Sequence, residues 1–472
     1  MRTTLRTRKC NQNWIIAGVL IAVYLIHLIV FYPGVCGYDT VNQIDDFFTG
    51  TEPRLSNWVS GEPISATLND HHPVTTTLIF AFFTKLGMIF GNVNFGMAIF
   101  NCCQILIMAF LFSHVICSAK KWGMKTGWTI VFLIYYLMPV NSFFAITMIK
   151  DTLFAVAFLV FYLVYTQIVR DVVNGEKEKN EYYVFLLIFS ILIALLNKKG
   201  MYIALISNLF LVFLSNSKKQ VMKALIAAIA PMLIITVLLG KILFPIFNVY
   251  PGGKQEALGF AFQQTARTMI DHPQDFSDEE KNVFYNVLQI QADELQDLYD
   301  NSRIDSIKDT FNASATNSDI KKFIALWIKK GISHPVTYVR ATFEVCGGYF
   351  VPIKSFNVYT KATYADSIGG FNNPDALKGA REFVIGIFKA LKKVPGIGIL
   401  FQNSIYTWWI PLVVFGCIIF KGDKRLLICL VPIAANILFL ILGPVCWTRY
   451  GLCQIYTLPV LVSVIFNSRV HL

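Results

Sequence analysis

The side chains that could carry chemistry stand in short polar segments beside apolar runs. The longest such segment follows the first apolar run, and Asp39 lies near its start. A carboxylate at a partly dehydrated membrane rim can have its pKa raised and accept a proton from a substrate hydroxyl. An aspartate at this place can also cap a helix over residues 41–48. We expect Asp39 to be catalytic and keep capping as the alternative.

An acid and two imidazoles close the same segment at Asp70, His71 and His72, just before Pro73. They could hydrogen-bond a phosphate, bind a divalent metal or cap a helix that begins at the proline. Neighbouring side chains of an extended segment point to opposite sides, which disfavours one ion held by both histidines. We therefore predict capping plus one functional histidine and no defined metal site, with a divalent cation left open as cofactor.

Polar breaks between later apolar runs supply cations. Lysines at such breaks either snorkel to the membrane interface or bind an anionic lipid head group. Arg449 stands in a very short break, to which the same argument applies. In the longest loop, one helix face would carry two glutamines and an arginine, for which a solvated face is the default. The residues in question are Lys150, Asp151, Lys198, Lys199, Gln263, Gln264, Arg267 and Arg449.

Composition indicates a bilayer protein. Of the 472 residues, 55% are hydrophobic and only 15% are charged, whereas soluble domains carry about a quarter charged residues. Apolar runs near the length that crosses a bilayer recur along the chain. Much of the net charge of +12 lies in clusters beside these runs, at 2–9, 120–125, 218–223 and 421–425. Such clusters mark cytoplasmic loops rather than a nucleic-acid-binding face.

The basic clusters also determine the predicted topology. The run 74–90 is long enough to be a span, but a crossing there would place the later clusters outside. If it lies in the interface as a juxtamembrane helix, every cluster falls inside with the N-terminus. We expect a multi-pass cell-membrane protein with both termini cytoplasmic and the polar segments outside. The ten predicted spans are 14–31, 96–118, 128–148, 152–169, 182–197, 200–215, 221–247, 404–420, 426–443 and 450–467.

Three regions follow from this topology. Residues 1–247 form a transmembrane module with a first external loop at 34–73 and a juxtamembrane helix at 73–90. Residues 248–403 form an extracytoplasmic, mainly helical loop domain, and 404–472 carry the last spans. Within the loop domain, helices are predicted over 254–272, from a capping box at 277–280, over 319–331 and from 334 to 348, with 354–374 irregular.

Several of these residues resemble the first external loop of the C-type (GT-C) membrane glycosyltransferases, which include protein O-mannosyltransferases and lipid A aminoarabinose transferases. The chain is more similar still to a group of largely uncharacterised bacterial multispanning proteins. The shared motifs are Tyr38-Asp39, Asn42-Gln43, His71-His72-Pro73, Lys150-Asp151, Gln263-Gln264-x-x-Arg267 and Arg449-Tyr450. A single proline after the histidines, and no Asp-Glu pair after the first span, depart from the mannosyltransferase pattern.

The resemblance implies a fold and a reaction. The fold would be an all-α, GT-C-like bundle of about ten spans. A sugar would pass with inversion from a polyprenyl-phosphate donor to an extracytoplasmic glycan, polymer or lipid, with Asp39 as general base. Cations would stabilise the leaving phosphate. The implied substrate-binding set is Tyr38, Gln43, Asp70, His71, His72, Lys150, Asp151, Lys198, Lys199, Gln263, Gln264, Arg267, Arg449 and Tyr450.

Two other classes of function remain open. A transporter or flippase of lipid-linked glycans would also use charges near the membrane, but it needs polar residues deep in several spans, and the sequence shows no inverted repeat. A scaffold protein would tolerate replacement of the external polar residues.

Overall fold

The computed structural model describes residues 2–50, 66, 68–177, 179–291, 293–363, 367–368 and 370–466, with the side chains of 2–11 and 421 left aside. Residues 51–65 and 67, in the middle of the predicted first external loop, lie outside this part. Within the described ranges the protein is mostly helical. By length and composition, six of its helices could cross a membrane, or seven if one bent pair is a single span: Gln12–Val30, Val93–Lys121, Lys150–Asn174, Lys218–Ile246, Lys424–Ile441 and Thr448–Phe466, with Thr126–Tyr136 plus Pro139–Ala145 as the pair.

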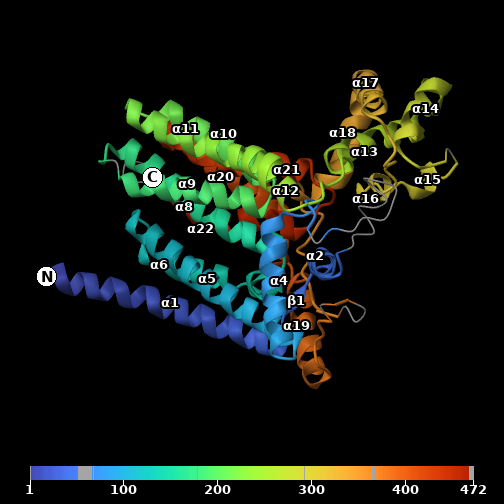
Figure 1. Cartoon of the computed structure of the whole chain (residues 1–472). Coiled ribbons are helices and arrows are strands. Elements are labelled where there is room, and N and C mark those ends of the chain that lie inside the picture. Colours follow the sequence, from blue (N-terminus) through green and yellow to red (C-terminus); the bar gives the residue numbers. More distant parts are fainter. Residues whose placement is uncertain are drawn as a thin grey trace.

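These helices lie side by side in one bundle (Figure 1). The central helices α8 (Lys150–Asn174) and α22 (Leu452–Ser463) are the most buried. Aromatic side chains fill the middle of the bundle, where the rings of Phe112 and Tyr136 stack with centroids 3.9 Å apart. The remaining helices of the bundle are α1 (Arg2–Val30), α5 (Val93–Lys121), α6 (Thr126–Tyr136), α9 (Asn180–Leu196), α10 (Lys199–Leu214), α11 (Lys218–Leu233) with η2 (Ile234–Leu243) and α12 (Phe244–Ile246), η7 (Ile405–Trp409) with α20 (Ile410–Lys421), and η8 (Lys424–Leu430) with α21 (Val431–Ile441).

The predicted span 128–148 is not one straight helix. It is split into α6 and the short α7 (Pro139–Ala145), which meet at an angle of 57°. The cause is Pro139, because a proline drives the preceding residue out of the helical region, and Met138 has ψ 142°. After α7 the chain is extended, which creates the strand that positions the site.

A two-stranded parallel sheet joins the first loop to the start of α8. Strand β1 (Val35–Cys36) pairs with β2 (Thr147–Met148), with Val35 opposite Thr147 and Cys36 opposite Met148. All four residues are fully buried. The sheet therefore fixes the register between the segment after α1 and the segment before α8.

Helix α4 (Val74–Ile89) follows Pro73 and runs crosswise to α1 and α5 near one end of the bundle (Figure 1). It packs closely on α5 through two glycines. A Cβ on Gly96 would lie 2.0 Å from the carbonyl oxygen of Phe83, and one on Gly87 would lie 2.9 Å from the backbone nitrogen of Gly96. A helix is therefore present in the region 73–90 for which a juxtamembrane helix is predicted.

The loop domain has a hydrophobic core of its own, formed between residues 258 and 327. The predicted capping box is present, with Ser277 and Glu280 bonded reciprocally at the start of α14. The irregular tract after α18 packs on the bundle instead: Ala362 and Phe371 share a cluster with Cys36 and Met148. The helices of the loop domain are α13 (Gln255–Asp271), α14 (Asp278–Val287), α15 (Leu295–Leu298), α16 (Asp305–Lys308), α17 (Asn317–Ser333) and α18 (Pro335–Cys346), and α19 (Lys378–Leu391) follows the tract.

The two ends of the bundle differ in character. Lys150 begins α8, whereas Arg170 lies near its far end, about 30 Å away at 1.5 Å per residue. Arg170 donates to the carbonyls of Trp122 and Ser463, and Arg425 donates to the carbonyl of Val173. Basic segments from separate loops therefore meet at the end remote from Lys150. Loop-domain residues line one cavity together with Lys150, so the loop domain lies at the Lys150 end of the bundle.

Candidate active site

The β1–β2 sheet places a carboxylate beside an ammonium group. Helix α2 (Tyr38–Thr49) begins two residues after β1, and α8 begins two residues after β2. The Thr40 hydroxyl donates to the carbonyl of Met148 at 2.7 Å and fastens the two helix starts together. Asp39 lies in the first turn of α2, where Gly37 is the N-cap and provides no side chain. Asp39 therefore does not cap this helix, and the capping alternative is wrong.

Arg449 reaches the same point from the other end of the chain. It lies in η9 (Thr448–Gly451), directly before α22. Asn357, in the irregular tract, holds this turn. Its side-chain oxygen accepts from the backbone N–H of Thr448 at 2.7 Å, and its backbone N–H donates to the Thr448 hydroxyl at 2.9 Å. Tyr359 lies two residues further along the same irregular tract. Arg449 Nη1 donates to its phenol oxygen at 2.8 Å.

Four charged side chains form the centre of the site, which we name the Asp39 cluster: Asp39, Lys150, Asp151 and Arg449. Oδ2 of Asp39 lies 3.1 Å from Nη1 of Arg449 and 3.8 Å from Nζ of Lys150. Asp151, 3% exposed, lies behind Arg449 with its Oδ2 3.8 Å from Nε. Arg449 Nη2 donates to the Tyr450 hydroxyl at 2.7 Å. Two acids and two bases thus lie together at the ends of the bundle helices.

The cluster determines the charge state of its neighbours. Burial raises the pKa of Asp39, but Arg449 and Lys150 outweigh it and hold that pKa well below the usual range. This contradicts the raised pKa expected for a carboxyl at a membrane rim, because the expectation counted dehydration without the cations. Burial, together with Lys150, lowers the pKa of His72. Neutral His72 accepts a hydrogen bond from Lys150 Nζ through Nδ1 at 2.7 Å.

The Asp39 cluster opens into a cavity of about 440 Å³ between the bundle and the loop domain. Both histidines of the predicted pair line it, with ring centroids 4.5 Å apart, so they do not point to opposite sides as expected. The helix cap predicted for this segment is also absent, because Pro73 itself precedes α4 without a capping side chain. The lining comprises Tyr38, Asp39, His71, His72, Lys150, Tyr359, Pro444, Val445, Trp447, Arg449 and Tyr450 from the membrane side, and Glu256, Arg303, Asp305, Lys308 and Asp309 from the loop domain.

Other predicted residues hold the frame around this cavity. The side-chain oxygen of Gln43 accepts from the hydroxyls of Thr76 and Thr77 at 2.9 and 3.1 Å, which ties α2 to α4. Lys198 is paired with Asp70 at 2.9 Å. Lys199 lies over the ring of Phe154, with Nζ 5.0 Å from the centroid. None of these residues lines the cavity.

The Gln-Gln-x-x-Arg motif stabilises the loop domain. Arg267 is paired with Asp271 at 2.8 Å and Glu344 at 3.3 Å. The side chain of Gln264 donates to Thr342 at 2.9 Å and that of Gln263 donates to the carbonyl of Asp300 at 2.8 Å. These three residues join α13 to α18 and to the segment before α16. They are not among the residues that line the cavity, so Arg267 is not placed as a cation of the Asp39 cluster.

Sequence reasoning missed the residues that arrive through the loop domain. Tyr359 lies in the irregular tract, and its aromatic neighbours gave it no distinguishing signal. Arg303 and Lys308 lie in charged segments of the loop domain that read as solvated faces. Lys308 forms ion pairs with Glu256 at 2.9 Å and Asp305 at 3.0 Å. Only the docking of the loop domain over the bundle reveals these residues as a wall of the cavity.

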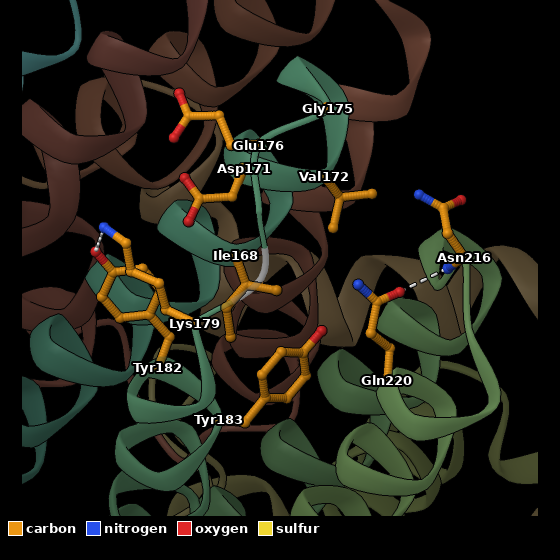
Figure 2. A pocket seen from close by; sticks show the side chains of 10 residues that line it. All are labelled: Ile168, Asp171, Val172, Gly175, Glu176, Lys179, Tyr182, Tyr183, Asn216 and Gln220. Atoms are coloured by element: carbon orange, nitrogen blue, oxygen red, sulfur yellow. Dashed lines mark hydrogen bonds between the residues drawn. The ribbon is translucent and has the colours of Figure 1, made fainter.

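A smaller cavity of about 160 Å³ lies at the other end of the bundle (Figure 2). It is formed around the end of α8 and the starts of α9 and α11. Asp171, Glu176 and Lys179 contribute its charges, and the Lys179 ammonium donates to the Tyr182 hydroxyl at 3.4 Å. It is separated from the Asp39 cluster by most of the length of α8.

Within the described ranges, one group of three side chains could hold a metal ion: His272, Asp275 and His334. It lies in the loop domain and not at the predicted histidine pair.

The fold and the site define a class of protein: a mostly helical chain with several helices of membrane-spanning length, whose charged side chains meet at one end of the bundle. The chain belongs to a family described as a family of unknown function (DUF6020), whose model matches residues 2–471. No curated protein and no solved structure matches the chain significantly.

Proposed function

We propose that this protein is a membrane glycosyltransferase that moves a sugar from a polyprenyl-phosphate donor to an extracytoplasmic acceptor, with Asp39 as general base. One observation carries the proposal: the Asp39 carboxylate and the cations Lys150 and Arg449 converge in a cavity at the ends of the bundle helices. A lipid phosphate is held at this depth while its sugar extends into the cavity. This is the arrangement that transfer from a lipid-linked sugar needs.

The membrane arrangement that fits this reaction has about ten spans. Four apolar helices of 10–17 residues would complete the longer ones if three cross and α4 lies in the interface: Val74–Ile89, Asn180–Leu196, Lys199–Leu214 and Ile405–Phe420. The basic end of the bundle then faces the cytoplasm, as the positive-inside rule requires. The Asp39 cluster and the loop domain face outward.

Arg449 and Lys150 bind the donor phosphate in this mechanism. The planar guanidinium of Arg449 offers several N–H groups, and Lys150 adds a compact charge. As the glycosidic bond breaks, the departing phosphate gains negative charge, so these cations stabilise the transition state more than the bound donor.

Donor binding also activates Asp39. In the free protein Arg449 and Lys150 hold its pKa low, which makes the carboxylate a weak base. A bound phosphate competes for both cations and raises that pKa toward its ordinary value. Asp39 then accepts the proton of the acceptor hydroxyl as the hydroxyl oxygen attacks the anomeric carbon from the face opposite the phosphate. The base gains strength only when the donor is in place.

The position of the charges favours a transferase over a transporter. Lys150 is the first residue of α8, and Arg449 lies in the turn before α22. The Asp39 cluster thus lies at helix ends, next to a loop domain that covers it. A transporter that alternates access needs its binding groups near the middle of the bilayer.

The test is the variant Asp39→Asn, purified in detergent and supplied with a panel of polyprenyl-phosphate hexoses and pentoses plus envelope acceptors. The native protein is expected to release polyprenyl phosphate from one donor. Asp39→Asn should bind that donor and release none. Asp278→Asn is the matched control, since its side chain is 97% exposed. Equal turnover by Asp39→Asn, or donor binding without turnover by the native protein, would refute the proposal.

A further inference from the structure

We infer that the loop domain contains a binding site for a transition-metal dication such as Zn²⁺, formed by His272, Asp275 and His334. One ligand atom of each side chain lies within 4.8 Å of the other two. Two imidazoles with one carboxylate are a donor set for Zn²⁺ and its neighbours in the first transition row, not for Mg²⁺ or Ca²⁺. The site is separate from the Asp39 cluster and independent of the proposed reaction.

The two histidines have the same local setting, at the end of a helix and before a proline. His272 ends α13 and precedes Pro273, and His334 ends α17 and precedes Pro335. A proline excludes the helical conformation from the residue before it. Both histidines accordingly leave their helices with nearly the same backbone angles, φ −136° and ψ 56° for His272 and φ −128° and ψ 56° for His334.

This shared geometry brings the two rings together. Their centroids lie 4.5 Å apart, and their planes differ by 20°. Asp275 follows His272 by one short turn, and its Oδ2 lies 3.4 Å from Nε2 of His334. The Thr337 hydroxyl lies 3.3 Å from Nε2 of His272 and adds a polar neighbour.

The geometry requires little movement to bind metal. At Zn–N and Zn–O distances near 2.0–2.1 Å, tetrahedral ligand atoms lie about 3.3 Å apart. The Asp275 side chain is 44% exposed and already lies beside His334, which is 15% exposed. Water would complete the coordination.

Lys330, which contacts the main chain of Asp275, has its charge balanced by an acidic partner. Lys330 donates to the main-chain carbonyl of Asp275, but Glu280 is paired with that ammonium at 2.7 Å. Burial raises the pKa of Glu280, but hydrogen bonds from Lys330 and Lys329 outweigh it and lower that pKa to about 2. The Glu280 carboxylate therefore remains charged. Bound metal would therefore clamp the end of α13 to the junction of α17 and α18.

The experiment uses the full chain, purified in detergent with a tag that contains no histidine. The protein is equilibrated with Zn²⁺ or Co²⁺, desalted and assayed by elemental analysis and visible absorption. We expect about one metal ion per chain, a Co²⁺ spectrum of a site with nitrogen ligands, and a higher unfolding temperature with Zn²⁺.

Two variants locate the metal. His272→Ala with His334→Ala should lose the ion and the Zn²⁺-dependent rise in unfolding temperature, and the matched pair His71→Ala with His72→Ala should keep both. Because a double variant can fold poorly, Asp275→Asn is added; it alters one exposed side chain and should weaken Zn²⁺ binding by ~10-fold or more. Absence of metal from the native protein, its retention by the first pair, or its loss only from the second would overturn the inference.

Discussion

At the scale of single residues, the proposed function depends on the several contacts that Arg449 makes at once. Its guanidinium contacts Asp39, Tyr359 and Tyr450 and lies 3.8 Å from Asp151. The side chain is 9% exposed, so these contacts act with little screening by water. A planar group with several N–H donors can contact several partners at once and, in the proposed mechanism, exchange the contact with Asp39 for one with the donor phosphate. An ammonium group cannot do this from the same position.

Arg449→Lys should therefore lower kcat/KM for the donor by ~10²-fold while the protein folds normally, because the charge remains but the fork of donors is lost. Initial rates at varied donor concentration measure this. Arg340→Lys serves as control, since Arg340 is 61% exposed and is paired with Glu344 in the same helix. Loss of activity no larger than in that control would contradict the phosphate-binding role.

The pH profile reports the charge on Asp39. Arg449 and Lys150 hold its pKa low, so the free protein keeps this carboxylate ionised well into the acid range. Lys150→Gln removes one of these cations, and the pKa of Asp39 must then rise. The acid limb of kcat/KM should move to higher pH in this variant, measured over pH 4 to 8. An acid limb unchanged from the native profile would show that Asp39 is not the titrating base.

At the scale of elements, the cavity depends on helix α4 and on the irregular tract at 354–374. Gln43 ties α2 to α4, and α4 is held on α5 by glycines that permit backbone contact. On the other side, the amide of Asn373 donates to the carbonyls of Phe31, Tyr32 and Gly34. Contacts made by α4, α5 and the irregular tract thus help to position α2 and Asp39.

Gly96→Ala tests this support. The added methyl group would meet the carbonyl of Phe83 at 2.0 Å, and backbone must move to admit it. Forced overpacking of this kind costs about 1–3 kcal/mol. A fall of several degrees in unfolding temperature in detergent is expected, with reduced transfer activity. Gly18→Ala is the control, because nothing lies within 4 Å of its added Cβ; equal behaviour of the two variants would show that α4 and α5 can separate freely.

At the scale of the whole molecule, the protein is polarised along the bundle axis. Basic segments meet at one end, and the Asp39 cluster and the loop domain lie at the other. A helix of the length of α8 connects the two ends. In the proposed function, this arrangement would let a lipid-linked substrate enter sideways from one leaflet while a polar acceptor approaches from water.

Epitope insertion checks the proposed orientation. A tag after Lys177, which is exposed at the basic end, should bind antibody only in permeabilised cells. A tag after Gln291 in the loop domain should bind antibody in intact cells. Accessibility of both tags from the same side would contradict the topology.

The sequence by itself determined the class of the fold and pointed to the residues that form the candidate site. Hydropathy and basic clusters predicted a helical membrane protein, because long apolar runs have few stable alternatives. Residue types singled out Asp39, Lys150 and Arg449, and proline and glycine signals predicted helix boundaries in the loop domain. Each of these inferences depends on neighbours in sequence.

Only the tertiary structure decided which of those residues meet. The β1–β2 register brings Asp39 to Lys150. The irregular tract that contains Asn357 and Tyr359 brings Arg449 to this pair. The same convergence reverses the expected direction of the Asp39 pKa shift and leaves Arg267 in the loop domain. Contacts between residues hundreds of positions apart depend on how helices pack, and charge states depend on those contacts, so neither can be read from local pattern.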